Sequence, residues 1–150
     1  SQITIWEGEA AAGGTVGSQT IDTASLGPKK INGDLVVNGT LTITGTIWVT
    51  GSITVSNGAT VKLAPEYGSL TGILMAGVNA DSNSGNITAS NNSTSAGSGT
   101  EGSYLLLISQ KNNTAVDAII ISNNALNSSI DLSNLLPSKV RVIGSTYFSF

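Results

Sequence analysis

The stretch that decides the fold is GDLVVNGTLTITGTIWVTGSITV, residues 33–55, which returns to the same pattern every six residues. Glycine opens each repeat, at Gly33, Gly39, Gly45 and Gly51, and aliphatic residues follow two and four places later. Residues two apart in a strand face the same side, so each repeat carries one apolar face. Because glycine permits a tight bend, the pattern predicts a short strand and a corner in each repeat.

A strand this short cannot bury its apolar face alone. If the chain turns the same way at every corner, three repeats close one coil of about 18 residues, and successive coils stack by backbone pairing. The alternative is a meander of short hairpins, but Thr44-Gly45 and Thr50-Gly51 are poor pairs for two-residue hairpin turns. The repeat therefore predicts an all-β protein built as a parallel β-helix.

A longer repeat points to the same fold. The segments ITVSNGAT, ITASNNST and IIISNNAL begin at residues 53, 87 and 119 and align without gaps. We interpret these intervals as close to two coils, which would stack Asn57, Asn91 and Asn123 as a polar ladder at one corner. Further strands are expected at residues 60–63, 72–76, 104–108, 129–132 and 139–143. The small, polar segment 78–103 predicts irregular arcs or a mobile loop.

Two expected strands, GILMA at residues 72–76 and YLLLIS at 104–109, are apolar on successive residues. This pattern predicts strands that are covered on both faces, by the coil interior and by a loop, a cap or another subunit. Trp48 points outward in its repeat, so we expect it beneath the N-terminal segment or a neighbour, with stacking on a sugar as the alternative.

The first six residues, SQITIW, alternate as a half-buried strand does. We expect a detached N-terminal strand and a linker over residues 1–30, and the solenoid domain over residues 31–150. The strand either caps its own solenoid or pairs with the next subunit. The expected subunit-interface residues are Ile3, Ile5, Trp6 and Trp48, with Tyr147, Phe148 and Phe150 at the opposite end of the chain.

Composition excludes several functions. Of 150 residues 10% are charged, the net charge is -3, and there is no cysteine and no histidine. The chain therefore has no basic footprint for nucleic acid, no thiolate metal site and no histidine as general base. No apolar run approaches the roughly 20 residues of a membrane helix. The acidic residues are widely spaced, so we expect surface carboxylates, no cofactor or metal, and no enzymatic activity.

Six Asn-x-Ser/Thr sequons are candidate glycosylation sites in a host that glycosylates such sequences. They begin at Asn38, Asn86, Asn91, Asn92, Asn112 and Asn127.

The repeats over residues 31–63 resemble those of bactofilins, which are polymer-forming right-handed β-helices. The longer stretch from INGDLVVNG through APEYGS, GSGTEGSYLLLIS and IIISNNA, about residues 31–126, resembles the β-solenoid ectodomains of exported, pilus-associated surface proteins. These resemblances imply a right-handed coil, a homopolymer and a location at the cell surface, and they carry over no catalytic residues. Because such ectodomains usually follow a hydrophobic helix that is absent here, we expect a processed form.

The expected function is that of a structural subunit of an extracellular filament or surface appendage, assembled by strand donation or by end-to-end stacking of solenoids. Two alternatives stay open. One is a carbohydrate-binding or polysaccharide-processing β-helix of a surface or phage fibre, with cell-surface glycans as partners. The other is a cytoplasmic scaffold similar to bactofilins.

Overall fold

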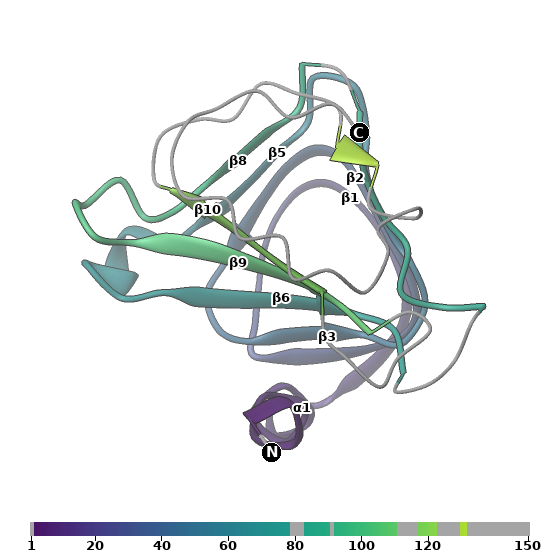
Figure 1. The fold of residues 1–150 in the computed structure, drawn as a ribbon. Coiled ribbons are helices and arrows are strands. Elements are labelled where there is room, and N and C mark those ends of the chain that lie inside the picture. The colour runs from purple at the N-terminus through teal and green to yellow at the C-terminus, as the bar shows by residue number, and fades with distance from the viewer. Residues whose placement is uncertain (1, 79–82, 91, 111–116, 123–129, 132–150) are drawn as a thin grey trace.

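The chain winds into a right-handed parallel β-helix. A computed structural model describes residues 2–78, 83–90, 92–110, 117–122 and 130–131. Figure 1 looks along the axis of the coils: the chain runs counterclockwise while successive coils come closer to the viewer, which makes the helix right-handed. The predicted all-β, parallel solenoid is confirmed.

Two long strands form the first coils, and shorter strands follow. β1 (Thr15–Leu26) and β2 (Lys29–Ile43) each bend around the axis. The other strands are β3 (Ile47–Val49), β4 (Ile53–Val55), β5 (Thr60–Leu63), β6 (Gly72–Ala76), β7 (Ile87–Ala89), β8 (Thr94–Ala96), β9 (Tyr104–Ser109), β10 (Asp117–Ser122) and β11 (Ile130–Asp131). A short 3-10 helix, η1 (Pro65–Tyr67), follows β5. The strands expected at residues 60–63, 72–76 and 104–108 are confirmed.

The coils have three faces, which the strand pairing defines. Face 1 holds the start of β2 with β3, β6 and β9; face 2 holds the middle of β2 with β4 and β7; face 3 holds the end of β2 with β5 and β8. Leu35 pairs with Ile53 and Lys29 with Ile47, so one early coil takes 18 residues, as three repeats predict. The inward residues of all three faces form one core.

The repeat glycines are needed mainly because the corners of adjacent coils lie close together. A Cβ atom at Gly39 would lie 1.8 Å from the carbonyl oxygen of Asp22, and one at Gly45 would lie 2.4 Å from the nitrogen of Pro28. Of the four repeat glycines only Gly33 has a positive φ, at 140°. The sequence pattern predicted the corners, but their physical reason is contact between coils more than backbone conformation.

The later coils are longer than the early ones. Ile53 of β4 pairs directly with Ile87 of β7, so the interval between the first two long repeats is one coil and the interpretation as two coils is wrong. The extra residues fall between strands, at the corner 64–71 and in the interval between β6 and β7. The segment 78–103 is likewise not all loop, since it contains β7 and β8.

The third long repeat does not continue the stack of the first two. It overlaps β10, which pairs antiparallel with β9 on face 1, whereas β4 and β7 lie on face 2. At the shared corner Asn92 Nδ2 donates to Asn57 Oδ1 at 3.3 Å, and Asn92 has a φ of 60°. Asn91, Asn123 and the strand expected at residues 139–143 lie outside the described residues, and of 129–132 only β11 is described as strand.

The expected N-terminal strand and linker are wrong. Residues 2–12 form an α-helix, α1 (Gln2–Ala12), and Thr15–Leu26 is the strand β1, so the solenoid begins at Thr15 and not at residue 31. The alternation of SQITIW is too short to separate strand from helix, and the EGEAAA that follows is rich in strong helix formers. Ile3, Trp6 and Ala10 recur at helical spacing and face the sheet.

Candidate functional site: the helix-covered face and the open first coil

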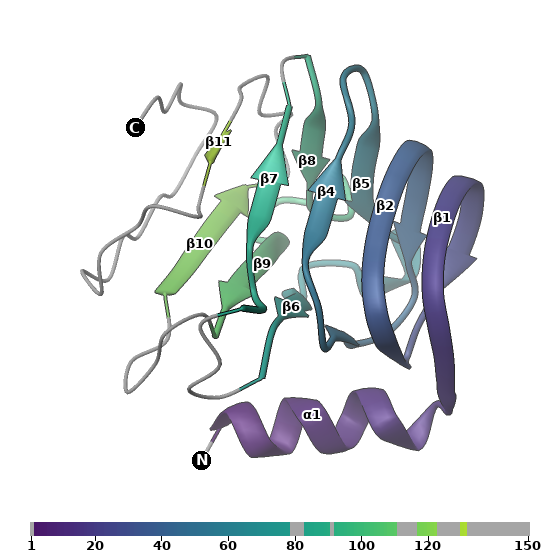
Figure 2. The same ribbon diagram turned by 90° about the vertical axis from the view of Figure 1, so that its right-hand side faces the viewer.

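The outer side of face 1 is apolar and α1 covers it. Met75 and Ile108 are fully buried there, and Ile3 and Trp6 of α1 pack against this cluster. Figure 2 shows α1 running alongside the coils, across the direction of the strands. The expectation of cover on both faces is therefore confirmed for GILMA, and for YLLLIS at Ile108, while Leu106 is only partly buried. Residues of α1 contribute the outer cover.

Polar contacts anchor α1 along its length. Lys29 Nζ donates to the carbonyl of Gly13 at 2.6 Å, where a cation also suits the negative end of the helix dipole. Thr46 Oγ1 donates to Glu9 Oε2 at 2.8 Å, and the buried Gln110 donates through Nε2 to Glu7 Oε1 at 3.1 Å. The helix is therefore tied both to an early corner of the solenoid and to the residue that follows β9.

Trp48 lies in this joint. Its indole Nε1 donates to the carbonyl of Gly77 at 2.9 Å, and Lys30 Nζ lies 4.3 Å from the ring centroid, a cation–π contact. Trp48 and Trp6 pack against the same buried cluster, as expected for a residue beneath the N-terminal segment. These contacts compete with any stacking of a sugar on the ring.

The structure brings together three of the expected interface residues, Ile3, Trp6 and Trp48. They form a joint within the chain. Ile5 is 54% exposed on α1 and takes no part in it. Tyr147, Phe148 and Phe150 lie outside the described residues.

The first coil presents an open edge. Along the described chain β1 pairs with β2 alone, so its other edge has no strand beside it. Figure 2 shows β1 at one end of the stack, with α1 beside the coils rather than across that end. The inward residues Val16, Ala24 and Leu26 are only partly buried. Their partners in β2, which are Ile31, Leu41 and Ile43, are fully buried.

One polar residue, Gln19, makes the open end of the solenoid less apolar. Gln19 pairs with Leu35, so it stands at an inward position that is apolar in the next coil. Its Nε2 donates to the carbonyls of Gly17 and Ser18 at 3.2 Å each. Sequence reasoning missed β1 because the strand lacks the repeat glycines. Val16, Ile21 and Leu26 pair with Ile31, Val37 and Ile43, but two register shifts change the interval from pair to pair, so no constant spacing marks β1 in the sequence.

The remaining candidates are distributed over the surface. Asn38 and Asn92 are exposed and Asn86 is partly buried, while Asn91, Asn112 and Asn127 lie outside the described residues. Asn38 Oδ1 accepts from Ser56 Oγ at 2.7 Å. Within the described ranges, no three acidic side chains gather as a metal site would require. No helix of those ranges is long and apolar enough to cross a membrane.

Comparison of the chain with protein-family models, with curated proteins and with solved structures finds no match in any of the three.

Proposed function

We propose that the protein is a structural subunit of an extracellular filament or cell-surface appendage, and that its copies join at the open first coil. The observation that carries the proposal is β1: a strand of 12 residues whose outer edge is unpaired within the described chain. A second copy that adds a coil there would pair the free backbone groups and cover Val16, Ala24 and Leu26.

The free edge of β1 has few features that prevent such pairing. Soluble proteins usually protect edge strands by keeping them short or by placing lysine, proline or inward charges on them. β1 is long and has no lysine and no proline, and Asp22 is its one charged residue. The antiparallel pairing of β10 with β9 and of β11 with β7 also indicates that the coil edges of this chain accept a strand in either direction.

End-to-end stacking is the mode that this arrangement favours. Donation of residues 1–6 as a strand has no support, because residues 2–12 are helical and α1 is anchored at Glu7 and Glu9. The location at the cell surface belongs to the proposal and rests on the resemblance to exported solenoids. A sugar-binding function has less support, because Trp48 packs in the cluster that α1 covers and its ring lies under Lys30.

The test is concentration-dependent assembly of the 150-residue chain, followed by sedimentation velocity and negative-stain microscopy. The test variant is Ala24→Lys, which places a charge at a half-buried inward position of the open coil. Its matched control is Thr54→Lys, which adds the same charge on the outer side of β4, in a coil that is already paired on both sides.

We expect wild type and Thr54→Lys to form end-to-end oligomers as concentration rises, and Ala24→Lys to stay monomeric with an unchanged far-UV spectrum. Wild type that remains monomeric at several hundred micromolar would refute assembly through this edge. If Ala24→Lys and Thr54→Lys assembled equally, the interface would not lie at β1.

A further inference from the structure

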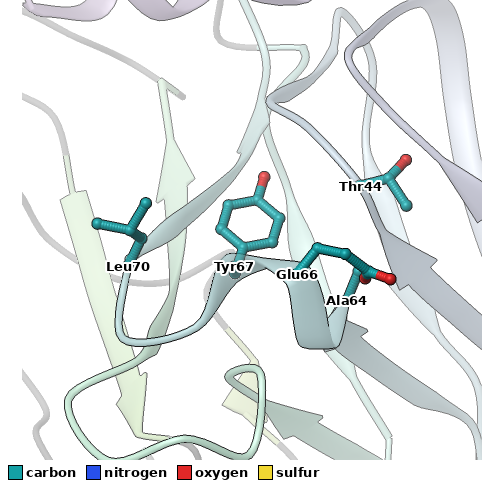
Figure 3. Close-up of a pocket in the computed structure, with 5 residues that line it drawn as sticks. All are labelled: Thr44, Ala64, Glu66, Tyr67 and Leu70. Atoms are coloured by element: carbon teal, nitrogen blue, oxygen red, sulfur yellow. The ribbon is translucent and has the colours of Figure 1, made fainter.

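A hollow lies at the corner between faces 3 and 1, where Thr44 also hydrogen-bonds to the carbonyls of Leu26 and Gly27 at the end of the first coil. It has a volume of about 440 Å³ and is lined by Thr44, Ala64, Glu66, Tyr67 and Leu70. Figure 3 shows the Tyr67 ring rising from the η1 loop between Leu70 and Glu66, with Thr44 on the neighbouring coil. This volume lies in the range of sites for small molecules.

The hollow exists because two stacked corners differ in length. The corner after β2 is the short segment 44–46, whereas the corner after β5 is the longer segment 64–71 that contains η1. The longer corner extends further from the core than the shorter one. The hollow is the space between the longer corner and Thr44 of the shorter corner.

Hydrogen bonds within the segment 64–71 and from the next coil fix the wall of the hollow that this segment forms. Within it, the nitrogens of Tyr67 and Leu70 donate to the carbonyls of Ala64 and Tyr67 at 3.0 and 2.9 Å. From the next coil, Ser103 Oγ donates to the carbonyl of Leu70 at 2.9 Å, and Ser98 Oγ donates to that of Gly68. The site is therefore formed before any ligand arrives, which lowers the cost of binding.

The chemistry of the hollow is apolar with negative charge at its margin. Leu70 is 67% exposed and Tyr67 is partly buried, so their side chains offer hydrocarbon to a ligand. Glu66 brings a carboxylate, and the carboxylate of Glu9 acts on the Tyr67 phenol, whose pKa is raised first by burial and then by that charge. Within the described part of the chain no lysine forms an ion pair with Glu66 or Glu9.

We propose that this hollow binds a small aliphatic amine in its protonated form. The hydrocarbon chain would lie against Tyr67 and Leu70, and the ammonium group would lie at Glu66, with the Tyr67 ring offering a further cation–π contact. Charge complementarity selects this ligand over a carboxylate of the same length, which Glu66 and Glu9 would repel. The inference does not depend on the proposed assembly function.

The test is a titration of isotope-labelled protein with three ligands of equal length, pentylamine, pentanol and pentanoate, followed by NMR at the Leu70 methyl groups and the Tyr67 ring. We expect saturable binding of pentylamine with a dissociation constant on the order of millimolar. Pentanol should bind about two- to fivefold more weakly, as expected for loss of one exposed charge contact, and pentanoate should not bind.

The variant Glu66→Gln should weaken pentylamine binding about two- to fivefold and leave pentanol binding unchanged. Its control, Asp22→Asn, removes an exposed carboxylate at the open end and should change neither. Equal affinity for all three ligands would refute the proposal. So would the absence of any NMR chemical-shift change with pentylamine at about 50 mM. A lysine peptide that binds more tightly than pentylamine would also refute it, because the site would then belong to a protein partner.

Discussion

Two glycines in this chain have opposite surroundings, although both lie in regular structure. At Gly39 a Cβ atom would lie 1.8 Å from the carbonyl oxygen of Asp22, which is backbone and cannot rotate away. At Gly8 in α1 an added Cβ atom would have no neighbour within 4 Å. The same substitution therefore tests contact between coils at one site and helix propensity at the other.

We predict that Gly39→Ala lowers the free energy of unfolding by about 1–3 kcal/mol, because the coils must separate to admit the methyl group. Gly8→Ala should raise it by about 0.5–1 kcal/mol, since alanine loses less entropy than glycine in a helix. Urea unfolding followed by circular dichroism measures both. A Gly39→Ala protein as stable as wild type would contradict the close stacking of the corners.

At the scale of the element, α1 is packed against the solenoid on one side only. Trp6 packs on the outer side of face 1, whereas Ile5, its neighbour in sequence, is 54% exposed. The chain has two tryptophans, Trp6 and Trp48, and both lie in this joint, so intrinsic fluorescence reports the docking of the helix.

We predict that Trp6→Ala lowers the free energy of unfolding by about 1–3 kcal/mol, because it removes a large apolar contact from the joint. The emission of the remaining Trp48 should shift to longer wavelength as water reaches the ring. Ile5→Ala is the matched control on the same helix, and its effect should stay within about 0.5 kcal/mol. If the two variants lost equal stability, α1 would not be docked by the face that carries Trp6.

The sequence predicts some elements of this fold well and others poorly. Leu35, Leu41, Ile47 and Ile53 occupy repeat positions that the pattern alone defines, and they are all buried in register. The helix was missed because Ile3 and Ile5 suggest alternation over a segment too short to show a helical period. The hollow could not be foreseen, since it depends on how the corner at 64–71 lies over the corner at 44–46.

At the scale of the whole molecule, α1 joins coils that are distant in sequence. Its docking surface takes Trp48 from β3, Met75 from β6 and Ile108 from β9, which belong to three successive coils. Glu7 and Gln110, which share a hydrogen bond, are 103 residues apart. In solenoids where each repeat contacts only its neighbours, repeats can unfold in separate steps. Here α1 adds contacts between coils that are not neighbours in sequence.

We therefore predict one cooperative transition. Tryptophan fluorescence, which reports the joint, and far-UV circular dichroism, which reports the strands, should give coincident urea curves. A fluorescence change at lower urea than the loss of strand signal would show that α1 detaches first and does not tie the coils together. The Gly8→Ala variant is a suitable control, because it should move both curves together.

The lengthening of the coils also has a consequence for protein engineering and for divergence. After β3, the residues added per coil lie between the strands, at the corner 64–71 and between β6 and β7, while the strands of each face remain three to six residues long. A fold that takes new sequence at its corners without disturbing its faces suits the display of foreign peptides. It also suits natural variation, because a loop can be exchanged there while the columns of leucine, isoleucine and valine stay in place.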